Sequence, residues 1–462
     1  MTTNAKLSRL ALVLGVMATG ACSFDIQNPN TPNVIGQNPN RSEVAATADG
    51  ILIATRADVA DWALDGAIFG REAYRIDPSD PRFSQEMMQG PLDPGSRAFG
   101  GDHWAEEYAA IRTANDLLAV IGTASALTAE EQSATSGFAH TFQAYNFLII
   151  LDSHSQDSIP IDVGTDVTAQ PAAFRTNADA YTHVENLLDS AATELAAAGT
   201  SAFPFTLPSG FTGFNTPATF IQFNRALRAR VAVYRGDFAG ALTFLAASFY
   251  NPGAALTLGV YMDFSAGPGD FANPLAIDPQ NGENFGHPTL RTQAQLQPPV
   301  PPQTTGDPDL RFLTKLVTRP SRSGGTTNTT PKQLITSDLG WIRYPSPNSP
   351  IPLIKNEELV LLHAEASIGL GDLVTANTDI NVVRTISGGL LPAPAFASAD
   401  AALTELLYNK RYSLMFEGGH SWIDYRRYGR TADLASIDRV GPPPDVIFPT
   451  LPIPTAEVQP RQ

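Results

Sequence analysis

Two copies of one helix–turn–helix pattern constrain the fold of this chain more than any other feature of its sequence. In each copy an apolar, alanine-containing helix runs into a Gly-Asp turn, and a second helix follows. The turns are Gly236-Asp237 and Gly371-Asp372. Glycine readily takes the left-handed conformation that ends a helix, and aspartate caps the helix that follows. The pattern therefore predicts paired helices that pack closely against each other.

Helical periodicity extends over most of the chain. It predicts helices over residues 41–64, 103–121, 129–151, 177–198, 220–234, 239–249, 357–369, 374–385 and 400–416. The two Gly-Asp units follow the logic of tetratricopeptide-type hairpins. A Pro/Gly-rich segment of about residues 251–352 separates them and has little helical period. We therefore predict a mainly α fold, with helical hairpins at about 41–250 and 353–430 and a loop-rich insertion that forms a second lobe.

The N-terminus predicts export and a lipid anchor. Lys6 and Arg9 precede a short apolar run, Leu10 to Met17, and small residues follow it, as in a secretory signal peptide. The run is too short to span a bilayer. Cys22, the only cysteine, comes directly after these small residues. These features predict a signal peptide at 1–21, a flexible tether at 22–40 that is acylated at Cys22, and a single domain at 41–462. Ordinary secretion with an unmodified thiol is the alternative.

The charge balance limits the partners of the chain. The sequence has 46 acidic and 30 basic residues, for a net charge of −16. Nucleic acids and anionic lipid surfaces both require basic patches, so neither is an expected partner. Membrane contact would then depend on the lipid anchor alone. One cysteine allows no internal disulfide, and an exported fold must be stabilised by its core.

Five motifs occur in order along the chain and together resemble one family. They are Trp104-x-x-x-Tyr108-x-x-Ile111-x-x-x-Asn115, Pro352-Leu353-Ile354 leading to Glu365-Ala366, Asn381-x-x-Arg384, Phe416-Glu417-Gly418 with Trp422-x-Asp424 and Arg426-Arg427, and Pro452-Ile453-Pro454 with Glu457. This set resembles the RagB/SusD family of outer-membrane lipoproteins. The sequence departs from the family pattern at Lys355 and Ser421, where arginine is frequent.

The resemblance implies a function as well as a fold. It implies a SusD-like, tetratricopeptide-like helical half joined to a loop-rich half. It also implies a surface-exposed, non-enzymatic lipoprotein of the bacterial outer membrane, without a cofactor. Such a protein captures an oligosaccharide or a peptide-like nutrient and acts as the lid of a SusC-like TonB-dependent transporter barrel. Two alternatives remain open: a surface-anchored hydrolase, and a helical-repeat scaffold that binds only protein.

The segment 416–429 holds several residues of catalytic types, including Glu417, His420 and Ser421. It lacks the second glycine of a nucleophile elbow. We therefore predict that buried Arg–carboxylate pairs of this segment hold the C-terminal helices together. His363 lies within an apolar helix, which favours a hydrogen-bonded core histidine. No metal-binding motif and no phosphate-binding loop occurs in the sequence.

Ligand-binding residues are predicted on the loops. Sugars bind to flat aromatic faces and to planar polar side chains. The family has no fixed binding motif, so the candidates follow from residue type alone. The first choices are Arg75, Phe83, Trp104, Trp341 and Tyr344, within a wider set that includes Tyr74, Arg82, Tyr261, Phe264 and Phe271.

Overall fold

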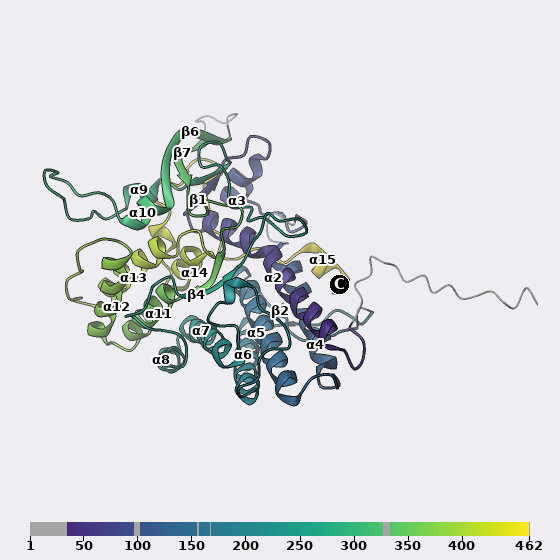
Figure 1. Cartoon of the computed structure of the whole chain (residues 1–462). Helices are drawn as coiled ribbons and strands as arrows, with labels where there is room; N and C mark the ends of the chain where they lie inside the picture. The colour runs from purple at the N-terminus through teal and green to yellow at the C-terminus, as the bar shows by residue number, and fades with distance from the viewer. Residues whose placement is uncertain (1–34, 97–101, 155–156, 167, 327–332, 462) are drawn as a thin grey trace, which may run out of the picture. The chain divides into compact units, whose positions relative to one another are not determined.

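Helices dominate the computed structural model, which describes residues 35–96, 102–154, 157–166, 168–326 and 333–461 (Figure 1). The predicted signal peptide, Cys22 and most of the predicted tether lie outside these residues. The longer helices are α2 (Arg41–Phe69), α4 (Asp102–Ile121), α5 (Ala129–Ser153), α6 (Asn177–Ala197), α7 (Pro217–Arg235), α8 (Phe238–Ala246), α11 (Asn356–Gly369), α12 (Leu373–Ile386), α13 (Ala399–Ser413) and α14 (His420–Arg427). The short ones are α3 (Glu86–Gln89), α9 (Thr289–Thr292), α10 (Leu310–Lys315), α15 (Thr455–Val458) and the 3-10 turns η1 (Pro81–Ser84), η3 (Ser209–Phe211), η4 (Thr431–Asp433) and η5 (Gln459–Arg461). The predicted mainly α fold is confirmed.

Both Gly-Asp units form the predicted hairpins. Gly236 and Gly371 have φ values of 77° and 82°, in the left-handed region that glycine tolerates best. The Asp237 side chain accepts a hydrogen bond from the Gly240 amide at 3.0 Å, at the start of α8. Asp372 accepts one from the Thr375 amide at 3.0 Å, at the start of α12. The same local chemistry therefore turns the chain in both copies.

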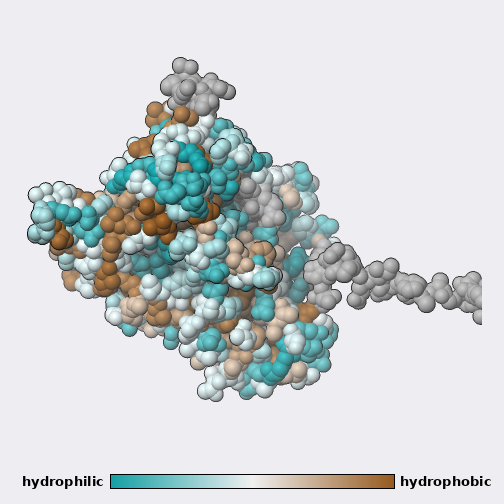
Figure 2. All heavy atoms as spheres, turned by 45° about the horizontal axis from the view of Figure 1, so that its top comes forward, coloured by the Kyte–Doolittle hydropathy of each residue, from teal (hydrophilic) through white to brown (hydrophobic). Residues whose placement is uncertain are grey.

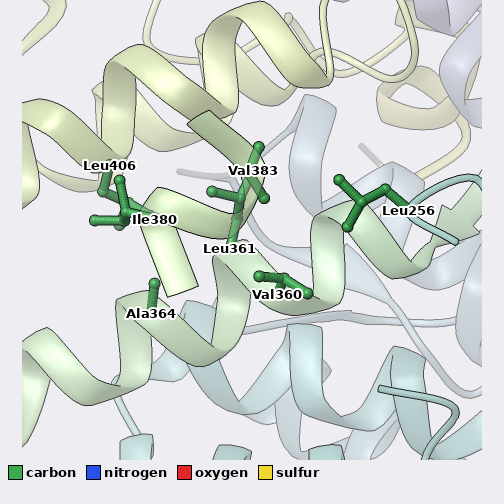
Figure 3. Packing of buried hydrophobic residues seen from close by; sticks show 7 residues of the cluster. All are labelled: Leu256, Val360, Leu361, Ala364, Ile380, Val383 and Leu406. Atoms are coloured by element: carbon green, nitrogen blue, oxygen red, sulfur yellow. The ribbon is translucent and has the colours of Figure 1, made fainter. Parts of the chain in front are cut away.

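The second hairpin packs on the next helix through an aliphatic cluster. Val360, Leu361 and Ala364 of α11 contact Ile380 and Val383 of α12 and Leu406 of α13 (Figure 3). These six side chains are fully buried, and Leu256 adds to the cluster from the segment after α8. Burial of each large aliphatic side chain contributes about 1.5–3 kcal/mol. The hairpin is thus held by its apolar face, as the periodicity of the sequence indicates.

Strands appear where the sequence predicts only loops. The antiparallel sheet β1-β5-β7-β6 consists of β1 (Ala73–Arg75), β5 (Asn284–Gly286), β7 (Gln333–Trp341) and β6 (Leu316–Thr326). Two small ladders join β4 (Gly259–Met262) to β8 (Ile351–Lys355) and β2 (Ile159–Pro160) to β3 (Phe174–Arg175). The register between β6 and β7 shifts between Thr318 and Arg322, around Pro320. Proline has no backbone N–H to donate to a strand ladder, and within sheets it occurs at such irregularities. The sequence pattern therefore does not predict β6 as a strand.

The C-terminal helices differ from the prediction at one turn. The helix predicted over 400–416 ends as α13 at Ser413, and α14 begins at His420. Between them Phe416 has a φ of 62°, which a non-glycine residue adopts only at a cost. A pattern of apolar residues does not reveal this turn, because tertiary contacts hold it.

None of the helices in the described ranges combines the length and the apolarity that a membrane span requires. Hydrophobic residues are visible at the left of Figure 2, beside the segment that joins α9 to α10. Within that joining segment Leu296 and Val300 are 54% and 69% exposed, and Leu313 of α10 is 40% exposed.

Candidate functional site

Four segments of the chain meet around an open cavity of about 660 Å³. α2 contributes Asp49, Leu52, Ile53 and Arg56, whose spacing places them on one face of the helix. The second segment is Pro208 to Phe211, the third runs from Met262, the last residue of β4, to Asp270, and the fourth supplies Asn348. Volumes of this order are typical of sites for small molecules.

Apolar side chains form the inner part of this cavity. Leu52, Phe211, Met262 and Phe264 line it, and each is at most 6% exposed. Ile53 lines it as well, but its side chain is 51% exposed. The cavity therefore combines a rigid apolar base with an apolar side chain that remains accessible at its edge.

Arg56 connects α2 to the loop after β4. Its Nη2 lies 2.7 Å from Asp270 Oδ1, and its Nη1 donates to the carbonyl of Asp263 at 3.3 Å. Its guanidinium carbon lies 5.4 Å from the ring centre of Phe271, within the range of a cation–π contact. Phe271 is 64% exposed. Arg56 thus fixes an exposed aromatic ring beside the cavity.

Asp263 holds the wall of the cavity that η3 forms with the end of β4. Its Oδ2 accepts hydrogen bonds from Ser209 Oγ and from the Gly210 amide, both at 2.6 Å. A Cβ on Gly210 would lie 2.1 Å from the carbonyl oxygen of Tyr261, so only glycine allows η3 to approach β4 this closely. The wall is therefore set by the backbone as well as by the carboxylate.

Two polar side chains at the cavity retain unused hydrogen-bonding capacity. Asp49 is exposed and has no hydrogen bond or ion pair within the described residues. Partial burial raises the pKa of its carboxyl above the ordinary value. Asn348 accepts a hydrogen bond from the Ala266 amide at 2.8 Å through Oδ1. This bond fixes the side chain and leaves its NH₂ group free to donate. The cavity can therefore both accept hydrogen bonds from a ligand rich in hydroxyl groups and donate hydrogen bonds to it.

Three of the five predicted binding residues are buried, which disfavours direct contact with a ligand. Trp104, Trp341 and Tyr344 are 1%, 3% and 3% exposed. Trp341 stacks on Phe416 with ring centres 4.3 Å apart, and the Tyr344 hydroxyl donates to the Phe416 carbonyl at 2.8 Å. These two side chains hold the strained Phe416 turn and present no free face to a ligand.

Arg75 and Phe83 do contact each other, away from the cavity. The guanidinium carbon of Arg75 lies 4.1 Å from the ring centre of Phe83, and its Nη2 lies 3.4 Å from Asp77. Both side chains are half-buried. Neither lines the cavity at α2. A role for this pair in binding stays a prediction.

A second cavity, of about 530 Å³, lies among α4, α5, α6 and the segment 161–165. Its polar side chains include Asn115, Gln143, His140 and His183. Asn115 and Gln143 bond each other at 2.6 Å, and His140 lies 2.7 Å from Glu194. The aromatic ring that lines it, Phe147, is 2% exposed. This cavity thus offers no exposed aromatic face, so the cavity at α2 is the better candidate for a sugar.

The C-terminal segment is structural, as predicted. Glu417 lies 2.8 Å from Lys355 and 3.0 Å from Arg343, and Arg427 lies 2.9 Å from Glu365. Ser421 is 1% exposed and donates a hydrogen bond to Glu72 at 2.5 Å.

The ring of His363 bonds Asp379 at 2.6 Å and stacks on Tyr250, although His363 is only half-buried. Within the described ranges, no group of three or more His, Cys, Asp or Glu side chains is arranged to hold a metal ion.

Sequence reasoning missed the residues of α2 that line the cavity. Asp49, Ile53 and Arg56 lie in a helix that has no marked sequence motif, and their common face is the only signal. Phe264 and Phe271 were within the wider aromatic set, and both lie at or beside the cavity. The cavity at α2 thus includes residues of the predicted insertion.

Comparison with known proteins identifies the fold. No family model matches the sequence, and no curated protein matches it either. Solved structures do match. A SusD-like carbohydrate-binding protein of Bacteroides fragilis has a TM-score of 0.68 at 14% identity, over 91% of this chain and 98% of its own. A SusD superfamily protein of Bacteroides vulgatus has a TM-score of 0.65 at 13% identity, over 92% and 98%. A laminarin-binding SusD-like protein has a TM-score of 0.60 at 16% identity, over 91% and 98%. The chain has the SusD-like fold.

Proposed function

We propose that this protein is a non-enzymatic, cell-surface lipoprotein that captures an oligosaccharide or a similar nutrient at the α2 cavity. It delivers this ligand to a TonB-dependent transporter of the outer membrane and acts as the lid of that transporter. Binding at a lid raises the concentration of ligand above the barrel, and closure then commits the ligand to transport. Weak, reversible contacts suit this task.

The observation that carries the proposal is the composition of the cavity. It joins buried apolar residues, the accessible side chain of Ile53 and the unused polar groups of Asp49 and Asn348. The exposed ring of Phe271 lies beside it, against Arg56. Aromatic faces and planar polar groups are what a sugar ring requires. Two solved proteins of the same fold are described as carbohydrate-binding and laminarin-binding, which supports the same class of ligand here.

The binding role is tested by truncating the exposed ring. Replacing Phe271 with Ala is expected to weaken oligosaccharide binding about three- to tenfold, because a stacked ring contributes about 0.5–1.5 kcal/mol beyond area burial. The ring is 64% exposed, so its loss has little effect on stability. Binding is measured by a glycan array and then by calorimetry.

The matched control for this variant is Leu391→Ala. Leu391 is a similarly exposed apolar residue, at 62%, and does not line the cavity. Unchanged affinity in the Phe271 variant would contradict the placement of the site. Turnover of any glycan would favour the hydrolase, and co-purification with a barrel in the absence of any glycan binding would favour the scaffold.

The lipid anchor is tested at Cys22. Replacing Cys22 with Ser removes the thiol that is acylated, and each lost methylene group removes about 0.8 kcal/mol of membrane affinity. We expect the variant to move from the membrane fraction to the soluble fraction after high-salt washing. Its unfolding midpoint is expected to stay unchanged, because Cys22 belongs to the predicted tether. A variant that stays in the membrane fraction would contradict this anchor.

A further inference from the structure

The charged groups at the α2 cavity are mostly acidic. Asp49, Asp263 and Asp270 line it, and Arg56 is the only cationic side chain among its lining residues. A carboxylate that carries its charge attracts cations and repels anions. The whole chain also has a net charge of −16, which adds a long-range field of the same sign.

Arg56, the one cationic side chain among the lining residues, already pairs with a carboxylate of the protein. Arg56 forms its ion pair with Asp270 at 2.7 Å. Its other contacts are to the Asp263 carbonyl at 3.3 Å and to the face of Phe271. Its Nε is buried and has no hydrogen-bond partner among the described residues. Arg56 therefore binds residues of the loop after β4 and is not available to pair with an anionic ligand.

Two carboxylates remain without a cationic partner. Asp263 receives hydrogen bonds from Ser209 and Gly210, which orient its carboxylate but leave its charge in place. Asp49 has no hydrogen bond or ion pair within the described ranges. A carboxylate accepts hydrogen bonds from neighbouring hydroxyl groups and pairs with an ammonium group, whereas it repels an anion.

We propose that this cavity selects saccharides by charge, accepting neutral and amine-bearing sugars and excluding sugars that carry carboxylate or sulfate groups. Asp49 is the selecting residue, since it lines the cavity and has no hydrogen bond or ion pair to the other described residues. Asn348 supplies the donor that a hydroxyl or ring oxygen requires. The inference rests on the proposed function, because it assigns a ligand class to the same site.

The test compares three probes of equal chain length, which are oligomers of N-acetylglucosamine, of glucosamine and of galacturonate, within a wider array of neutral and acidic glycans. Replacing Asp49 with Asn keeps the shape of the side chain and removes its charge. We expect affinity for the amine-bearing class to fall about two- to fivefold and affinity for the acidic class to rise by a similar factor. We expect the change in affinity for the neutral sugars to lie between the changes for the amine-bearing and the acidic sugars. Both changes shrink at about 0.5 M salt, where charges are screened within a few ångströms.

Asp61→Asn is the matched control, because Asp61 is an exposed carboxylate of the same helix outside the lining of the cavity. Acidic glycans that bind the wild type tightly, and lose affinity in the Phe271→Ala variant, would overturn the charge selection and leave the binding function intact. Equal effects of the Asp49 and Asp61 variants would overturn the role of Asp49. Absence of binding to every glycan on the array would overturn the proposed function itself.

Discussion

Replacing Glu417 with Ala is expected to lower the free energy of unfolding by about 3–5 kcal/mol, because it leaves buried charges without a partner. Glu417 is 5% exposed and lies 2.8 Å from Lys355, 3.0 Å from Arg343 and 3.7 Å from Lys315. Burial lowers the pKa of Lys315 to about 7, so Lys315 is the member of the group that loses its proton most readily. The measurement is urea unfolding at pH 7.

The pH dependence of this stabilisation follows from the direction of the Glu417 shift. Although burial opposes the ionised form, Lys355, Arg343 and Lys315 hold the pKa of Glu417 well below its ordinary value of 4.5. The stabilisation is therefore fully present above about pH 4.5 and is lost only as the pH falls through the lower, folded-state pKa. The control is Arg175→Ala, which breaks an exposed ion pair with Asp162 and is expected to have little effect. Equal stability of the two variants would contradict a structural role for Glu417.

Replacing Trp341 with Ala is expected to destabilise the protein by about 3–5 kcal/mol, the usual cost of truncating a buried aromatic residue. The side chain is 3% exposed and stacks on Phe416, whose φ of 62° requires support from its neighbours. The variant that remains folded is expected to bind oligosaccharide with the affinity of the wild type, because Trp341 does not line the cavity.

This second expectation separates stability from binding. Thermal unfolding measures the first, and calorimetry at a temperature where the variant is folded measures the second. The Phe271→Ala variant is expected to show the opposite pattern, with normal stability and weaker binding. If the Trp341 variant had normal stability and reduced affinity for oligosaccharide, Trp341 would be a binding residue. That result would contradict its assignment to the core.

The helical part of the fold was predictable because its signals are local. The Gly-Asp turns carry their own chemistry, as Gly236 and Asp237 illustrate with a left-handed φ and a cap on α8. The apolar residues of α12 recur at helical spacing and bury one face of that helix, and the apolar run of α11 is buried along nearly its whole length. The sheet was not predictable in this way, since β1 pairs with β5 across about 200 residues of intervening chain and Pro320 interrupts the pattern of β6.

The candidate site was harder to predict because residue type does not determine burial. Trp341, Tyr344 and Phe271 are all aromatic residues of the same insertion. The first two pack under the Phe416 turn and the third is held at the surface by Arg56. Asp49 and Arg56 belong to the first helix of the described body, and only the folded chain brings them beside the loop after β4.

The most direct test of the central claim is a crystal structure of the Cys22→Ser protein with the best-binding oligosaccharide of the array. We expect sugar in the cavity at α2, with hydroxyl groups bonded to Asp49 and Asn348 and a ring against Phe271. Sugar bound at another place, such as the second cavity beside His140 and His183, with the α2 cavity empty, would contradict it.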